Sequence, residues 1–72
     1  MDRVQEDRFR IAGILWAFDP LRLRQFRQSN EYDSYAESIQ LIRDRETVRV
    51  TLVVNGIFEE PMFEQLCSYL DV

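Results

Sequence analysis

Three carboxylates, Asp19, Glu31 and Asp33, are the residues of this chain whose type and spacing could support chemistry. If the Asp19-Pro20 corner packs against the segment that contains the other two, the three would form an acid/base pair or a site for a divalent cation. Each carboxylate also stands where a helix cap or a first-turn acid belongs, and that position needs no further role. We favour capping, and therefore predict no catalytic, cofactor-binding or metal-binding residue.

Two tyrosines, Tyr32 and Tyr35, accompany these acids and could face a ligand. Their spacing with Ile39 and Ile42 is helical, so we expect them in the core or at its rim, with hydroxyls that reach polar partners. Trp16 would anchor an interface if it were exposed, although a small core is expected to bury its single Trp.

Nucleophilic chemistry is poorly supported by the rest of the chain. Cys67 is the single cysteine, so no disulfide can form, and without any His neither a Cys–His pair nor a zinc site can be assembled. Because Cys67 stands near Leu66 and Leu70, we expect it to be a small core residue. Lys is also absent, and the two glycines are 43 residues apart, which excludes a glycine-rich phosphate loop. The sequence therefore predicts a protein that is not an enzyme and has no cofactor.

Size and composition point to a partner. The 72 residues suit a single small globular domain over 1–72, and 46% of them are apolar and 12% aromatic. A domain of this size hides only about 60% of the surface that its unfolded chain exposes, so another chain is expected to cover part of the apolar surface. We therefore expect self-association or a protein partner.

Charge and hydropathy exclude two other classes of partner. The net charge is −4, which opposes the phosphate neutralisation on which nucleic-acid binding depends. The longest apolar run, residues 14–18, is shorter than the roughly 20 residues of a membrane-spanning helix. The polar, acidic N-terminal residues are also wrong for a signal peptide. We expect a cytoplasmic protein that binds neither nucleic acid nor membrane.

The apolar spacing predicts several helices. Residues 3–18 form an amphipathic pattern that contains Val4 and Phe9 and ends at Asp19-Pro20, which can in turn begin a short helix over about 20–27. Further helices are predicted over 31–43, with Gln40 and Arg43 facing outward, and over 61–70, opened by a proline.

Residues 46–58 fit two interpretations. The alternation of Val48, Val50, Leu52 and Val54, followed by Asn55-Gly56, is typical of a strand and a hairpin turn. A helix is also consistent, because Val50, Val53, Val54, Ile57 and Phe58 recur at spacings of three and four. We favour the helix.

Two motifs, Phe18-Asp19-Pro20 and the run from Asn30 to Tyr35, together with a looser match over 54–59, resemble those of a small family of uncharacterised bacterial proteins, a domain of unknown function. In that family the turn after the first helix usually reads Trp-Asp-Pro, and this chain has Phe18 in place of the Trp. The resemblance implies a helical domain with a helix at 46–58, and no biochemical activity comes with it. The predicted fold is all-α, a small four-helix bundle-like domain. The alternative is α+β, with a hairpin or strand at 47–58 packed on helices.

The function we expect is that of a non-enzymatic protein–protein interaction module or homo-oligomer. The alternative is an acidic inhibitor or immunity-type protein that blocks a basic target, such as a nuclease or a nucleic-acid-handling complex. The candidate interaction surface combines the two motifs with the acidic start of the last helix: Trp16, Phe18, Asp19, Glu31, Tyr32, Asp33, Tyr35, Glu59 and Glu60.

Overall fold

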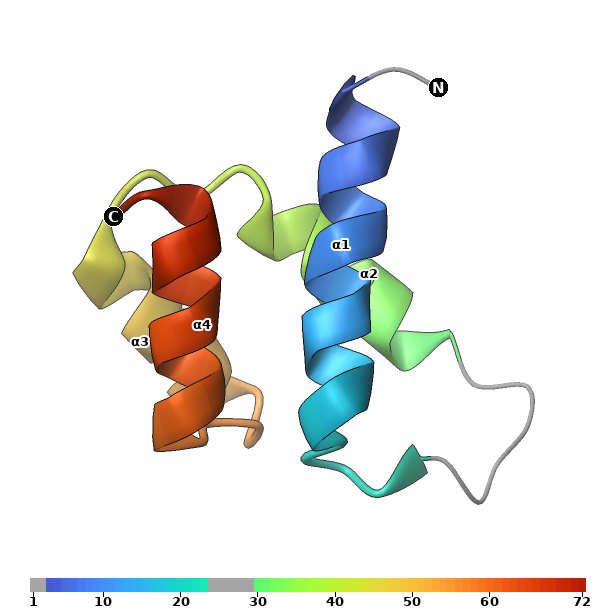
Figure 1. Cartoon of the computed structure of the whole chain (residues 1–72). Coiled ribbons are helices and arrows are strands. Elements are labelled where there is room, and N and C mark those ends of the chain that lie inside the picture. The colour runs from blue at the N-terminus through green and yellow to red at the C-terminus, as the bar shows by residue number, and fades with distance from the viewer. Residues whose placement is uncertain (1–2, 24–29) are drawn as a thin grey trace.

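Helices alone make up the regular structure of the described chain, which is residues 3–23 and 30–72 of a computed structural model. They are α1 (Arg3–Phe18), α2 (Glu31–Ile39), α3 (Arg45–Val54) and α4 (Glu60–Leu70). α1 packs against α2 and α4, and α3 packs chiefly against α4 (Figure 1). The predicted all-α bundle-like fold is confirmed, and the alternative with a strand or hairpin at 47–58 is wrong.

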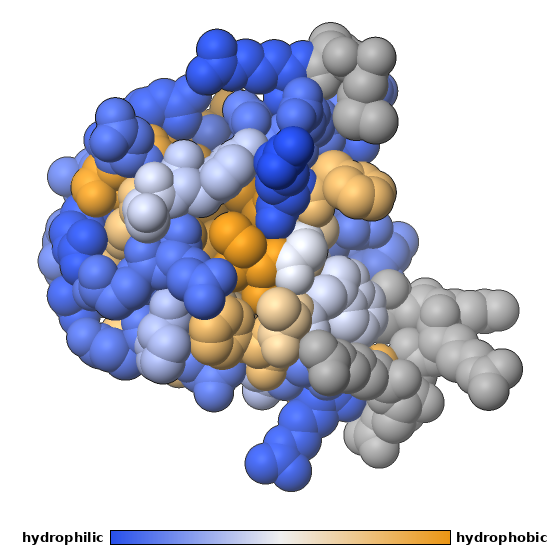
Figure 2. All heavy atoms as spheres, in the orientation of Figure 1, coloured by the Kyte–Doolittle hydropathy of each residue, from blue (hydrophilic) through white to orange (hydrophobic). Residues whose placement is uncertain are grey.

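The core lies where the four helices meet, and Figure 2 shows apolar atoms gathered along the line between α1 and α4. Cys67 is fully buried, as predicted, and burial raises the pKa of its thiol, so it serves as a core residue. The buried apolar side chains come from every helix and from the turn before α4: Ile11, Ala12, Leu15, Tyr32, Ala36, Ile39, Val48, Leu52, Ile57, Met62, Phe63, Leu66 and Cys67.

Two residues of the predicted α1 core lie outside it. Val4 and Phe9 are 61% and 74% exposed. Val4 is exposed because the first turn of α1 projects beyond the end of α4 (Figure 1). Phe9 is exposed because it lies on a different side of α1 from the buried Ile11 and Leu15. Helical spacing predicts which face a residue occupies, but it does not predict how far along the helix its neighbours extend.

The caps of α3 explain why a valine-rich segment is helical. The Asp44 carboxylate accepts hydrogen bonds from the Thr47 N–H and hydroxyl, both at 2.9 Å. At the other end Gly56 has a left-handed φ of 70°, and the Ile57 N–H donates to the Leu52 carbonyl at 2.9 Å. This is the usual glycine stop of a helix. Asn55-Gly56 therefore ends α3 instead of forming a hairpin turn, and Ile57 returns to the core.

The cap on α3 leads to a prediction for acid stability. Hydrogen bonds from Thr47 hold the pKa of the Asp44 carboxyl below its usual value of 3.8. A carboxyl with a depressed folded pKa stabilises the fold above its unfolded pKa, and that contribution is lost as pH falls from the unfolded pKa through the lower folded value. In thermal melts over this range, Asp44→Asn is expected to lose less Tm on acidification than the wild type. Glu60→Gln controls for the loss of one first-turn charge, and equal acid losses in all three proteins would contradict the prediction.

The segment after α1 differs from the predicted helix over 20–27. Residues 20 and 21 form a turn, and Asp19 and Arg22 both adopt left-handed backbone angles, with φ of 49° and 55°. A right-handed helix cannot pass through Arg22 in this conformation. Residues 24–27 of that prediction lie outside the described residues.

The end of α2 also differs from its prediction. The helix stops at Ile39 instead of residue 43, and the chain tightens as the Leu41 and Ile42 N–H groups donate to carbonyls three residues earlier. Gln40 consequently turns inward and is only 9% exposed, so its predicted outward position is wrong. Arg43 is exposed as predicted.

Candidate functional site

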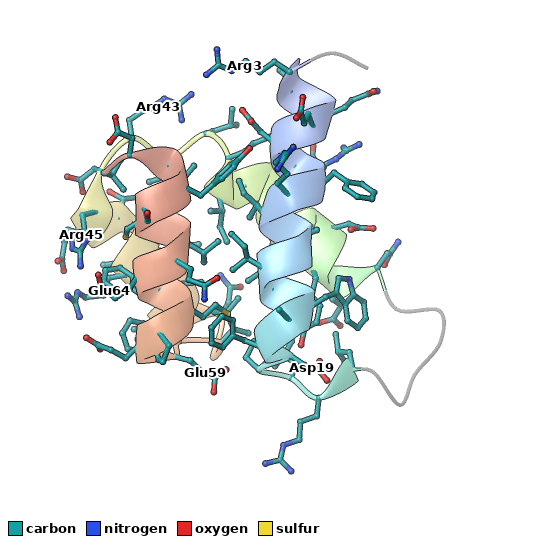
Figure 3. The ribbon with its side chains drawn as sticks, viewed as in Figure 1. Arg3, Asp19, Arg43, Arg45, Glu59 and Glu64 are labelled. Atoms are coloured by element: carbon teal, nitrogen blue, oxygen red, sulfur yellow. The ribbon has the colours of Figure 1, made fainter. Side chains whose placement is uncertain are left out.

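The Asp19–Tyr32 pair joins the end of α1 to the start of α2. The Tyr32 hydroxyl donates to Asp19 Oδ1 at 2.7 Å and accepts a hydrogen bond from the Leu21 N–H at 2.9 Å. The Leu23 N–H donates to the same carboxylate oxygen, also at 2.7 Å. Asp19 lies at the lower end of α1 in Figure 3. Its carboxylate caps the turn that follows α1, and it also fixes α2, which has no cap from the Asn30 side chain.

The raised pKa of Tyr32 argues against a role of the Asp19–Tyr32 pair in proton transfer. Burial, followed by the hydrogen bond to Asp19, raises the pKa of Tyr32 to about 12. The ring is fully buried and meets Trp16 edge-on, with 4.6 Å between ring centroids and 86° between their planes. A tyrosine that keeps its proton at neutral pH is a hydrogen-bond donor, so the pair acts as a structural link between helices.

The other residues of the predicted interaction surface do not share one position. Tyr32 is buried and cannot contribute to a surface, while Trp16, Phe18, Asp19 and Tyr35 are half-buried. The exposed members, Glu31, Asp33, Glu59 and Glu60, stand at the N-terminal ends of α2 and α4, where acids complement the helix dipole. Within residues 3–23 and 30–72, no group of three or more His, Cys, Asp or Glu side chains is placed to hold a metal ion.

A cluster of arginines on aromatic rings joins α3 to α4. The guanidinium carbons of Arg45 and Arg49 each lie 4.8 Å from the centroid of the Phe63 ring. Arg45 also forms an ion pair with Glu64, and the two lie together in Figure 3. Glu64 is therefore engaged within the protein, and this cluster holds α3 in place.

The outer side of α3 carries an apolar surface that we call the valine face: Val50, Val53 and Val54, which are 49%, 56% and 76% exposed. The sequence indicated the helical spacing of these valines but not their exposure. Val48 and Leu52 occupy the buried side of α3 instead.

Comparisons with known proteins identify no relative. No protein-family model, curated protein or solved structure matches this chain. The resemblance to a bacterial family therefore stays a prediction. In the part of the chain that the structure describes, each helix is too short or too polar to cross a membrane.

Proposed function

We propose that this protein is a non-enzymatic protein-interaction module that self-associates through the valine face of α3. The observation that carries the proposal is the exposure of Val50, Val53 and Val54 at helical spacing on one side of one helix. Single exposed apolar residues are normal on protein surfaces, whereas contiguous ones mark sites of interaction.

The composition of α3 supports a role beyond helix formation. Valine loses side-chain freedom in a helix, so an exposed position favours residues such as Gln, Glu or Arg. α3 packs chiefly against α4 and leaves its opposite side uncovered (Figure 1). Three valines on that side lower the helix propensity of α3, and in the monomer they are at most about half-buried. Contact with an apolar surface would recover part of that cost.

A second copy of the chain is the partner that the valine face fits best. In an antiparallel α3–α3 pair around a two-fold axis, Val50 of each copy meets Val54 of the other, as an isologous interface requires. The three valines are apolar, and the charged residue that borders them is Glu46, one turn before Val50. Stable complexes bury about 800 Å² per partner, which is more than three valine side chains supply. We therefore expect a weak dimer whose population depends on concentration.

The alternative, an acidic inhibitor of a basic target, has less support. Glu6, Glu37, Glu46 and Glu64 all contact arginines of the same chain, which reduces the negative surface offered to a partner. The two proposals differ in their response to salt, because screening weakens charge attraction but not apolar contact. Association that collapses with rising salt would favour the inhibitor.

The double variant Val50→Gln/Val54→Gln tests the valine face. Gln is the better helix former by about a few tenths of a kcal/mol per position, so the variant monomer is expected to be slightly more stable. Its self-association, measured by sedimentation equilibrium up to millimolar protein, is expected to be lost.

Val4→Gln is the matched control, because Val4 is 61% exposed on a different helix. It should leave association unchanged. A wild type that sediments as a monomer over the whole range, or a double variant that associates equally well, would overturn self-association through α3.

A further inference from the structure

We propose that Asn55-Gly56, at the end of α3, is a site of spontaneous covalent modification, where Asn55 becomes aspartate or isoaspartate when the last turn of the helix opens. Gly56 suits the left-handed φ of 70° that stops α3, but nothing in that stop requires an asparagine before it. Both residues are exposed to water, which the reaction consumes. The modification does not depend on the valine face.

The reaction needs an asparagine followed by a backbone nitrogen that no side chain hinders, and Gly56 has no Cβ beside its nitrogen. The Gly56 nitrogen attacks the side-chain carbonyl carbon, Cγ, of Asn55. An N–Cγ bond forms and the Cγ–Nδ2 bond breaks, and Nδ2 leaves as ammonia with the proton of the Gly56 amide. Water then opens the five-membered imide. Hydrolysis of the N–Cγ bond gives aspartate, and hydrolysis at the backbone carbonyl carbon gives isoaspartate.

The folded backbone holds the two reacting groups apart. In the imide ring, the Gly56 nitrogen must lie on the same side of the Cα–C bond of Asn55 as Cβ does. The ψ angle of Asn55 is 1°, which places that nitrogen in line with the backbone nitrogen of Asn55 instead. Ring closure therefore requires rotation about the Cα–C bond, and the chain from Gly56 onward must move with it.

Hydrogen bonds within α3 hold both groups in these unreactive positions. The Gly56 N–H, which is the nucleophile, donates to the Val53 carbonyl at 3.0 Å. Asn55 Nδ2, which is the leaving group, donates to the Thr51 carbonyl at 2.8 Å. These bonds must break before the ring closes, so the rate of modification depends on how often the turn opens.

Ile57 is the residue that keeps the turn closed. Its side chain is 1% exposed, and its N–H donates to the Leu52 carbonyl at 2.9 Å. Because Ile57 directly follows Gly56, rotation at Asn55 withdraws Ile57 from the core. The opening that leads to modification is therefore local to the end of α3, and it is opposed by the burial of this side chain.

Neither product can restore the closed turn. Aspartate and isoaspartate both lose the amide that donates to the Thr51 carbonyl. They add a carboxylate at the C-terminal end of α3, which already carries partial negative charge. Isoaspartate also routes the main chain through Cβ and Cγ, which displaces Gly56 and Ile57 relative to the helix. The modification thus converts a reversible opening into a lasting loss of the helix stop.

The test follows residue 55 of the full chain by mass spectrometry during incubation for weeks at neutral pH. The protein is kept dilute, so that the proposed weak dimer is dissociated. In guanidinium chloride, where the turn is lost, Asn55 is expected to react much faster than Asn30, the internal control, whose following residue is Glu31. In native buffer Asn55 should still react, but at least about tenfold more slowly, because opening costs free energy. Equal rates in the two solutions, or no product at residue 55 in either of them, would overturn the proposal.

Two conservative variants locate the opening. Ile57→Val weakens the contact that closes the turn, so it should raise the native rate at Asn55 about two- to tenfold and leave the rate in guanidinium chloride unchanged. Ile11→Val, the same change at a fully buried position in α1, is the matched control and should leave the native rate unchanged. Equal acceleration by both variants, or by neither, would overturn a local opening at the end of α3.

Two substitutions at residue 55 test the effect of the product. Asn55→Asp reproduces one product, and it should have a lower Tm than Asn55→Gln, which keeps a neutral amide at the end of the helix. Equal Tm values would overturn the inferred loss of the helix stop.

Discussion

Replacing Tyr32 by Phe is expected to lower the free energy of unfolding by about 2 kcal/mol, because the change removes two hydrogen bonds at a half-buried site, one of them to a carboxylate. The lost hydroxyl donates to Asp19 at 2.7 Å and accepts from the Leu21 N–H at 2.9 Å. Phe fills the same space, so the loss reports the hydrogen bonds and not the packing of the ring. Urea unfolding at neutral pH measures it, and for a chain of 72 residues the loss is a large part of a total of roughly 4–11 kcal/mol.

Tyr35→Phe is the matched control for this experiment. The hydroxyl of Tyr35 makes an exposed contact of 3.5 Å with Glu31, which is too long and too accessible to water to contribute much. Its removal should change the free energy of unfolding by less than about 0.5 kcal/mol. If Tyr32→Phe proved as stable as Tyr35→Phe, the hydroxyl of Tyr32 would not be what joins α1 to α2.

The bounds of α1 follow from the sequence because local chemistry decides them. Asp19-Pro20 cannot continue a helix, and the observed helix ends at Phe18 as predicted. The end of α2 is different, since no proline or glycine marks it. The chain leaves the helix at Ile39 so that Gln40 can enter the interior, and that depends on how α1 and α4 close the bundle. Contacts between elements override local preference here.

In the candidate sites, too, the sequence predicts features that depend on neighbouring residues and misses those that depend on contacts between distant segments. The sequence predicted that Asp19 would cap a short helix after α1, where the structure has a turn, and that the hydroxyl of Tyr32 would reach a polar partner. It did not predict that the two are partners of each other, because the pairing spans 13 residues and requires a left-handed Asp19. The valine face followed from the helical interpretation of 46–58 only once the buried side of α3 was known.

The segment 46–58 shows how a locally ambiguous sequence becomes a helix. Its β-branched residues favour a strand by composition. Asp44 at one end and Gly56 at the other provide the start and stop signals of a helix, and the spacing of Val48 and Leu52 gives it a buried side. The buried side of α3 must also pack against the rest of the bundle, and the ring of Phe63 in α4 provides a central contact.

Truncating that ring, Phe63→Ala, is expected to have the largest effect of any change considered, a loss of about 3–5 kcal/mol in the free energy of unfolding. Phe63 is fully buried, it lies 5.5 Å from Phe58 between ring centroids, and it receives both Arg45 and Arg49 on its ring. The cavity would form at the junction of α3 with α4. Because α3 has a low intrinsic helix propensity, its amides should lose hydrogen-exchange protection before those of α1 and α2.

Phe63→Leu separates the contribution of volume from that of the aromatic ring. Leu keeps most of the buried apolar volume, so the packing loss should be only about 1 kcal/mol, while both arginines lose the ring over which they lie. The Leu variant is therefore expected to keep α3 protected and to keep the valine face in its present form, so that the proposed self-association persists. The Ala variant should lose both together, because the valine face exists only while α3 is a helix. If Phe63→Ala cost no more than Phe63→Leu, the junction would depend on contacts other than this ring.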